Sequence, residues 1–121
     1  MDNNRIIKNP LKDNTHTTVI SSRETKALNS IDIYSVEKSS PKDMICKIRF
    51  QTGTIQELGV NGVSIEDLIV ICIDRLESFQ AGPLGNRENQ MAITKLEEAL
   101  MWLNKRTADR KMRAVEGTYR P

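Results

Sequence analysis

Residues 64–103 decide the fold, and they read SIEDLIVICIDRLESFQAGPLGNRENQMAITKLEEALMWL. Ser64 is a preferred N-cap residue, and the acidic Glu66 and Asp67 suit the positive end of a helix dipole. A helix is therefore expected to start at Ser64 and to run to about Gln80, because a Gly-Pro pair follows and stops it.

A second helix start follows within a few residues. Asn86 is an N-cap candidate, and the pattern predicts a long helix from there through about Met112. Apolar residues recur in this helix at spacings of three and four, namely Ile93, Leu96, Leu100 and Leu103. Two such helices joined by a short Gly-Pro-Leu-Gly loop predict an αα-hairpin.

The apolar content exceeds what one hairpin needs. Residues 68–73 are apolar without a break, so more than one face of the first helix should be covered and this helix should be central. Ala92, Ala99 and Trp102 widen the stripe of the second helix. That helix therefore has apolar surface for its hairpin partner and also for another chain.

The N-terminal part favours strands. Short β-like runs at 17–21 and 31–36 predict weak strands, with an edge position as one alternative. Residues 44–50 alternate in polarity like a half-buried strand. With Gly53 as the turn, they predict a β-hairpin over 44–58.

The expected fold class is therefore α+β, with N-terminal antiparallel strands followed by a long αα-hairpin that dimerises through its helices. The expected division is a β-rich part over 1–63 and the hairpin with a basic C-terminal tail over 64–121, in a single compact domain. A chain of 121 residues normally makes one domain.

Charge and composition exclude several classes of protein. Eighteen Lys and Arg against 16 Asp and Glu give a formal charge of +2, too small to indicate a duplex nucleic-acid binder. No secretory leader or membrane span is evident, so we expect a cytoplasmic protein. Cys46 and Cys72 each lie in an apolar run and are expected to be buried, reduced thiols, with a disulfide as the minor alternative.

Catalytic and metal-binding motifs are absent from the sequence. His16 is its one histidine, and it lies in a polar stretch. No zinc, triad or nucleotide-binding glycine motif occurs, so we expect no metal, no cofactor and no catalytic residue. The loop over 82–85 precedes a helix whose N-terminus could attract an anion, but loops of this length are typical of a simple interhelix turn.

The end of the long helix is basic. Within nine positions it carries five cations and one acid, Asp109. The cations are Lys105, Arg106, Arg110, Lys111 and Arg113. A solvated helix end that complements the dipole is one interpretation. Convergence of the arginines on phosphate oxygens is the other, because residues three and four apart share a face and guanidinium groups bind phosphate bidentately.

Three further side chains have both a structural and a functional interpretation. Phe79 is either a core residue closing the hairpin or a platform for an adenine ring. Asn89 is either a capping residue or a hydrogen-bonding group for a ribose or base. Trp102 fits the core or a dimer seam better than a ligand contact.

From Phe50 to Thr118 the chain resembles the hairpin domain shared by two phage anti-defence families, the anti-Thoeris sponges and the anti-CBASS sponges. The resemblance rests on several long phrases in the same order: FQTGTIQELGVNG, IEDLI, DRLESFQAGP, REN, KLEEALMWLNKRTADR and VEGT. The β-rich N-terminal part is similar to the anti-Thoeris branch.

This resemblance implies a sponge that sequesters the glycocyclic ADP-ribose signal of a Thoeris system, so that the effector is not activated. It implies that Phe79 stacks on adenine and that Asn89 and Arg106 bind the ribose and pyrophosphate. Gly117 and Thr118 match a segment with which some relatives hold CBASS cyclic di- or trinucleotides. Residues 84–86 depart from the family pattern.

A second copy is needed if one ligand is to touch both helix ends. Asn89 and Arg106 are 17 residues apart, which is roughly 26 Å in a helix. Antiparallel packing of two long helices would bring Asn89 of one copy near Arg106 of the other, in a homodimer or an assembly of dimers. A messenger-degrading enzyme and a phage adaptor that binds a host protein are the alternative functions.

Overall fold

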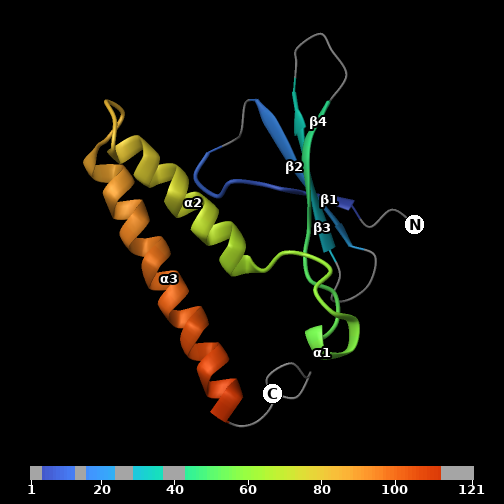
Figure 1. The fold of residues 1–121 in the computed structure, drawn as a ribbon. Coiled ribbons are helices and arrows are strands. Elements are labelled where there is room, and N and C mark those ends of the chain that lie inside the picture. Colours follow the sequence, from blue (N-terminus) through green and yellow to red (C-terminus); the bar gives the residue numbers. More distant parts are fainter. Residues whose placement is uncertain (1–3, 13–15, 24–28, 37–42, 113–121) are drawn as a thin grey trace. The chain divides into compact units, whose positions relative to one another are not determined.

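The computed structural model describes residues 4–12, 16–23, 29–36 and 43–112. The contacts of these described residues form two compact units, one that falls within 1–53 and 60–63 and one that falls within 54–59 and 64–112. The α+β prediction is confirmed, since a four-stranded antiparallel sheet is followed by two long helices that pack together (Figure 1). The prediction of a single compact domain divided at residue 63 stays a prediction.

The first unit is a sheet whose strands follow sequence order, β1-β2-β3-β4, with every pair antiparallel. The strands are β1 (Asn4–Ile7), β2 (Thr17–Arg23), β3 (Asn29–Ser35) and β4 (Met44–Arg49). The two weak runs of the sequence are β2 and β3, and they lie in the centre of the sheet. The edge alternative was therefore wrong, because the short strand β1, which the sequence did not signal, takes one edge and β4 takes the other.

The register gives the sheet one apolar face. Ile7 pairs with Val19, Val19 with Ile33, and Ile31 with Ile48, so these side chains share a face. Ser21 lies among them and is only 2% exposed. The opposite face is more polar and carries an ion pair between Lys47 and Asp32 at 2.9 Å.

The predicted hairpin over 44–58 was wrong in its second half. The chain turns at Gly53, whose φ is 72°, but residues Ile55–Leu58 form the short helix α1. Thr54 caps this helix, because its hydroxyl accepts a hydrogen bond from the Glu57 amide at 3.2 Å. The Thr54 hydroxyl thus gives the Glu57 amide a local partner. In a β-hairpin that amide would have needed a carbonyl on the strand across the turn.

After α1 the chain returns to the end of β4. The Val63 amide donates to the Arg49 carbonyl at 2.9 Å, and Val63 forms a parallel bridge with Phe50. A Cβ atom on Gly62 would lie 2.5 Å from the Phe50 carbonyl carbon and oxygen, so this approach requires glycine. Asn61 fixes the same return by exchanging two hydrogen bonds with the Thr52 backbone, at 2.8 and 3.0 Å.

The second unit contains the predicted αα-hairpin, which is confirmed (Figure 1). Helix α2 (Ile65–Gln80) begins with a capping box in which the Ser64 hydroxyl accepts from the Asp67 amide at 3.1 Å. Helix α3 (Arg87–Met112) is capped by Asn86, whose side-chain oxygen accepts from the Asn89 amide at 2.7 Å.

One stripe of α3 is turned toward α2. Ile93 is buried, with 4% of its surface exposed. Half-buried positions recur at helical spacing along the same side: Asn89, Leu96, Ala99, Leu100, Leu103, Thr107 and Arg110. The apolar stripe of the sequence therefore forms the seam of the hairpin.

Helix α2 is less covered than the sequence suggested. The expectation of a central helix was wrong, since α2 has no buried residue and Ile71 is 62% exposed. The burial of the cysteines was wrong for the same reason, because both thiols are free and exposed. Cys46 lies on the edge strand β4, and Cys72 lies on a side of α2 that α3 does not cover. None of the helices within the described ranges has the apolar length that a membrane span needs.

Candidate functional site

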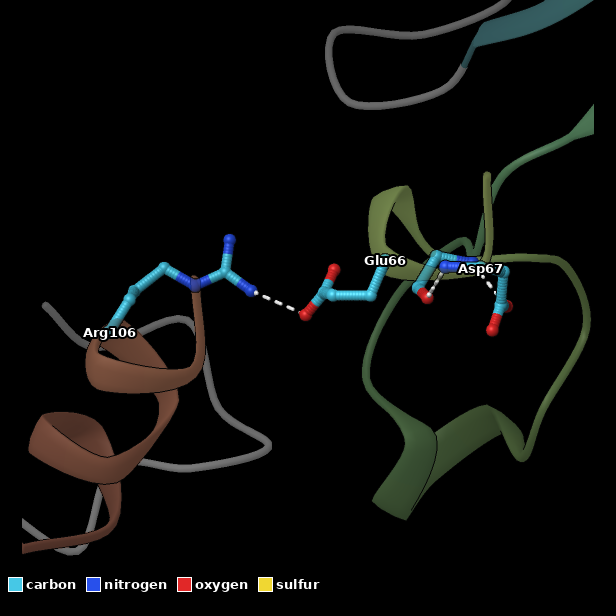
Figure 2. A network of polar contacts seen from close by, with 4 residues as sticks. Glu66, Asp67 and Arg106 are labelled. Carbon is cyan, nitrogen blue, oxygen red and sulfur yellow. Dashed lines mark hydrogen bonds and ion pairs between the residues drawn. The ribbon is translucent and has the colours of Figure 1, made fainter. Parts of the chain in front are cut away.

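The guanidinium of Arg106 meets a carboxylate from the start of the other helix (Figure 2). Arg106 Nη2 lies 3.2 Å from Glu66 Oε2, and the two side chains remain 48% and 36% exposed. One edge of the guanidinium is directed at Glu66, and among the described residues no other side chain is found to accept from its remaining donors. The head of Arg106 is thus held at the surface in a defined position.

Glu66 is available for this contact because its neighbours secure the helix start. Asp67 completes the capping box by accepting from the Ser64 amide at 2.9 Å, as the sticks beside Glu66 show (Figure 2). Glu66 lies in the first turn of α2, where a negative charge is favourable. The contact joins residues 40 positions apart, so it links the first turn of α2 to the C-terminal part of α3.

The rest of the basic end is partly neutralised by acids. Lys105 and Asp109 form an i,i+4 ion pair at 3.0 Å with both side chains more than half exposed. Such a pair contributes little to stability. Arg110 is half-buried and lies one helical turn beyond Arg106. The solvated-end interpretation is therefore supported for Lys105, whereas Arg106 and Arg110 both lie close to the hairpin seam.

The other end of the hairpin carries Phe79 and Asn89. Phe79 is half-buried, and the Arg75 guanidinium carbon lies 4.7 Å from the centre of its ring. This is a cation–π contact that covers one face of the ring.

Asn89 is tied to the interhelix loop by its side-chain amide. Its Nδ2 donates to the Leu84 carbonyl at 3.2 Å and to Gln80 Oε1 at 3.4 Å. Gln80 in turn clasps the Asn86 backbone, accepting from its amide at 2.8 Å and donating to its carbonyl at 2.9 Å. The capping interpretation of Asn89 was incomplete, since Asn86 is the cap and Asn89 belongs to this loop network.

Within one chain the predicted site residues form two groups. Phe79 and Asn89 lie at the loop end, while Arg106 and Arg110 lie near the start of α2. Asn89 and Arg106 are on one continuous helix, so about 26 Å of helical rise separates them. The remaining predicted residues, Arg113, Gly117 and Thr118, lie outside the described residues.

Glu66 and Gln80 were missed by the sequence interpretation. Each contacts a predicted ligand residue from the opposite helix. Glu66 could have been found, because an acid in the first turn of one helix lies opposite the basic end of the other helix in an antiparallel hairpin. Nothing in the sequence pattern singles out Gln80. Among residues 4–12, 16–23, 29–36 and 43–112, no group of three or more His, Cys, Asp or Glu could hold a metal ion.

The protein belongs to the class in which a β-sheet is followed by a helical hairpin. In this chain the hairpin carries polar and cationic side chains at each end. Residues 42–108 match the family described as Acb2/Tad1, hairpin domain. The chain belongs to this family, as its sequence predicted. The matched segment contains Phe79, Asn89 and Arg106, and it ends before Arg110.

The chain is also similar to the protein named Thoeris anti-defense 1 of Bacillus phage SBSphiJ7. The two are 56% identical over 86 residues, which is 69% of this chain. The alignment spans 61% of the length of the phage protein.

Proposed function

We propose that this protein is a phage anti-defence sponge that binds and sequesters the glycocyclic ADP-ribose signal of a Thoeris system in the cytoplasm of the infected bacterium. It blocks effector activation by holding the messenger and performs no chemistry on it. The observation that carries the proposal is the family match together with the likeness to a Thoeris anti-defence protein.

The accessible side chains supply the chemistry that such a ligand needs. Arg106 is nearly half exposed and has guanidinium donors that Glu66 does not occupy. These donors would bind the pyrophosphate by charge-assisted hydrogen bonds, with Arg110 and Arg113 adding to the positive potential. Phe79 would stack on adenine, and Asn89 would bind the ribose. Gly117 and Thr118 would serve a second site for cyclic di- or trinucleotides.

One chain cannot bring these groups to a single small ligand, because the two ends of α3 are about 26 Å apart. Two copies related by a two-fold axis, with their α3 helices antiparallel, would place Asn89 of one copy beside Arg106 of the other. Such a homodimer would hold two equivalent sites.

A second stripe of α3 supports this assembly. Six exposed residues recur along it at alternating spacings of three and four: Glu88, Met91, Lys95, Glu98, Trp102 and Lys105. Trp102 is 66% exposed and Met91 is 46% exposed, so neither belongs to the core of its own chain. The core alternative for Trp102 was therefore wrong, and the seam between two copies remains as its proposed role.

The order of side chains in this stripe is self-complementary. When two stripes run antiparallel about a midpoint between residues 96 and 97, Met91 meets Trp102 of the second copy. In the same register Lys95 meets Glu98 of the second copy, and Glu88 meets Lys105. Apolar side chains thus oppose apolar ones and each acid opposes a base. In this register Asn89 and Arg106 of the second copy are offset along the helix axis by about 3 Å, which is the rise of two residues.

Isothermal titration against glycocyclic ADP-ribose and a panel of cyclic di- and trinucleotides tests the proposal. Wild-type protein should bind the glycocyclic messenger with one site per chain, and Arg106→Ala should weaken binding by about a hundredfold, because a hydrogen-bonded charge is lost. Lys111→Ala removes an exposed cation from the same helix end and is the matched control. Absence of binding to the wild-type protein would refute the proposed function.

Recovery of the ligand separates the sponge from the two alternatives. Messenger released by heating the complex should have its original mass, whereas a cleaved product would show an enzyme. An adaptor would instead carry a stoichiometric host protein on the exposed apolar side of α2, where Ile71 lies, and would show no change in melting temperature with the messenger.

A further inference from the structure

The loop end of the hairpin determines which atoms of Asn89 can reach a ligand. Both acceptors that Asn89 Nδ2 contacts, the Leu84 carbonyl and Gln80 Oε1, belong to its own chain. The opposite amide orientation would direct Oδ1 at two oxygen atoms that donate nothing. The amide nitrogen therefore points into the loop, and Oδ1 is the atom left to face outward.

Gln80 holds this orientation. Its carboxamide makes a two-way clasp on the backbone of Asn86, at 2.8 and 2.9 Å, which fixes its oxygen beside Asn89. Gly85 permits the clasp, because a Cβ atom there would lie 3.2 Å from the Cα, carbonyl oxygen and side-chain oxygen of Gln80. The segment 84–86, where this chain departs from the family pattern, thus supplies the partners of Gln80 and Asn89.

We infer that Gln80 is a positioning residue that holds Asn89 so that its side-chain oxygen faces the ligand as a hydrogen-bond acceptor. Asn89 then selects a ligand group that donates, such as a ribose hydroxyl, and disfavours a phosphate oxygen at that position. This rests on the proposed function, since it concerns the ligand that the hairpin binds. A carbonyl oxygen facing a phosphate would bring two acceptors together with no proton between them. A ligand phosphorylated on that hydroxyl should therefore bind poorly.

The test compares Gln80→Met, which keeps the length of the side chain but removes its polar atoms, with Gln90→Met. Gln90 is exposed on α3, so it provides the same substitution outside the network. Titration with glycocyclic ADP-ribose should show a three- to tenfold loss of affinity for Gln80→Met, the value of about one hydrogen bond, and no change for Gln90→Met. The double variant Gln80→Met with Asn89→Ala should bind like Asn89→Ala alone.

Analogues of the messenger test the acceptor role directly. One analogue, in which a single ribose hydroxyl is replaced by hydrogen, should bind wild-type protein more weakly than the messenger does. The same analogue and the messenger should bind the Asn89→Ala variant equally well. Equal affinity of wild-type protein and Gln80→Met would overturn the inference. Fully additive losses in the double variant would do the same, because Gln80 would then act independently of Asn89.

A readout without ligand keeps this inference separate from the proposed function. The side-chain amide protons of Asn89 should exchange slowly in wild-type protein and faster in Gln80→Met and in Gly85→Ala, as measured by NMR. Unchanged exchange in both variants contradicts the network even if the messenger binds. Protected amide protons in a protein that binds no messenger refute the proposed function and leave the network intact.

Discussion

Replacing Glu66 with glutamine should change stability and ligand affinity in opposite directions. The ion pair with Arg106 spans 3.2 Å, but both side chains are more than a third exposed, so solvent screens it. A pair of this kind contributes about 0–1 kcal/mol to the free energy of unfolding. The melting temperature of Glu66→Gln should therefore fall by no more than about 4 °C.

The affinity for the messenger should rise in the same variant. In the proposed complex the Glu66 carboxylate and a ligand phosphate share the Arg106 guanidinium, at a separation of roughly 6 Å. Two like charges at that distance repel by about 0.7 kcal/mol in a water-like dielectric, which corresponds to roughly threefold in the dissociation constant. The gain should shrink as the salt concentration rises.

Calorimetric titration at low and high salt measures this effect, beside thermal unfolding of the free protein. Glu97→Gln is the matched control, because it removes one exposed carboxylate of α3 and no ion pair of Glu97 is found among the described residues. A Glu66→Gln variant that binds the messenger more weakly than wild type would refute the reasoning. Glu66 would then act as an orienting group for Arg106 and not as a competitor of the phosphate.

Four further substitutions test the helix cap, the close approach at Gly62 and the proposed dimer. Ser64→Ala removes the cap of α2 and should lower the free energy of unfolding by about 1 kcal/mol in chemical denaturation, without changing the dissociation constant for the messenger. Gly62→Ala should cost about 1–3 kcal/mol in the same assay, because its Cβ would overlap the Phe50 carbonyl, and wild-type stability would contradict that close approach. Lys95→Glu alone and Glu98→Lys alone should each weaken the proposed dimer in sedimentation equilibrium, and the double exchange should restore it. An apparent mass that is the same for wild type and for all three variants would exclude the proposed register.

Local signals made the helices predictable from the sequence. The cap at Ser64, the cap at Asn86 and the apolar spacing of α3 act within a few residues, so they were visible without tertiary structure. The β-hairpin prediction failed at the same local level, because the capping hydroxyl of Thr54 outweighed the alternating pattern and started a short helix.

Burial could not be predicted, because it depends on what covers each face. The apolar run of α2 suggested a central helix, but α3 covers one side of it and Ile71 stays exposed. The contacts of the site depend on register in the same way. Glu66 meets Arg106 and Gln80 meets Asn89 only because the loop length sets how the two helices are paired. The sequence resemblance indicated Asn89 and Arg106 but not the residues that hold them.

A mixing experiment tests the shared site most directly. Asn89→Ala and Arg106→Ala proteins, each unable to bind the messenger tightly, are combined in equal amounts, allowed to exchange subunits and titrated. If each site takes Asn89 from one copy and Arg106 from the other, half of the dimers become mixed and carry one intact site, so about a quarter of all sites should regain wild-type affinity. A mixture that binds no better than its two components would contradict a site built across two copies.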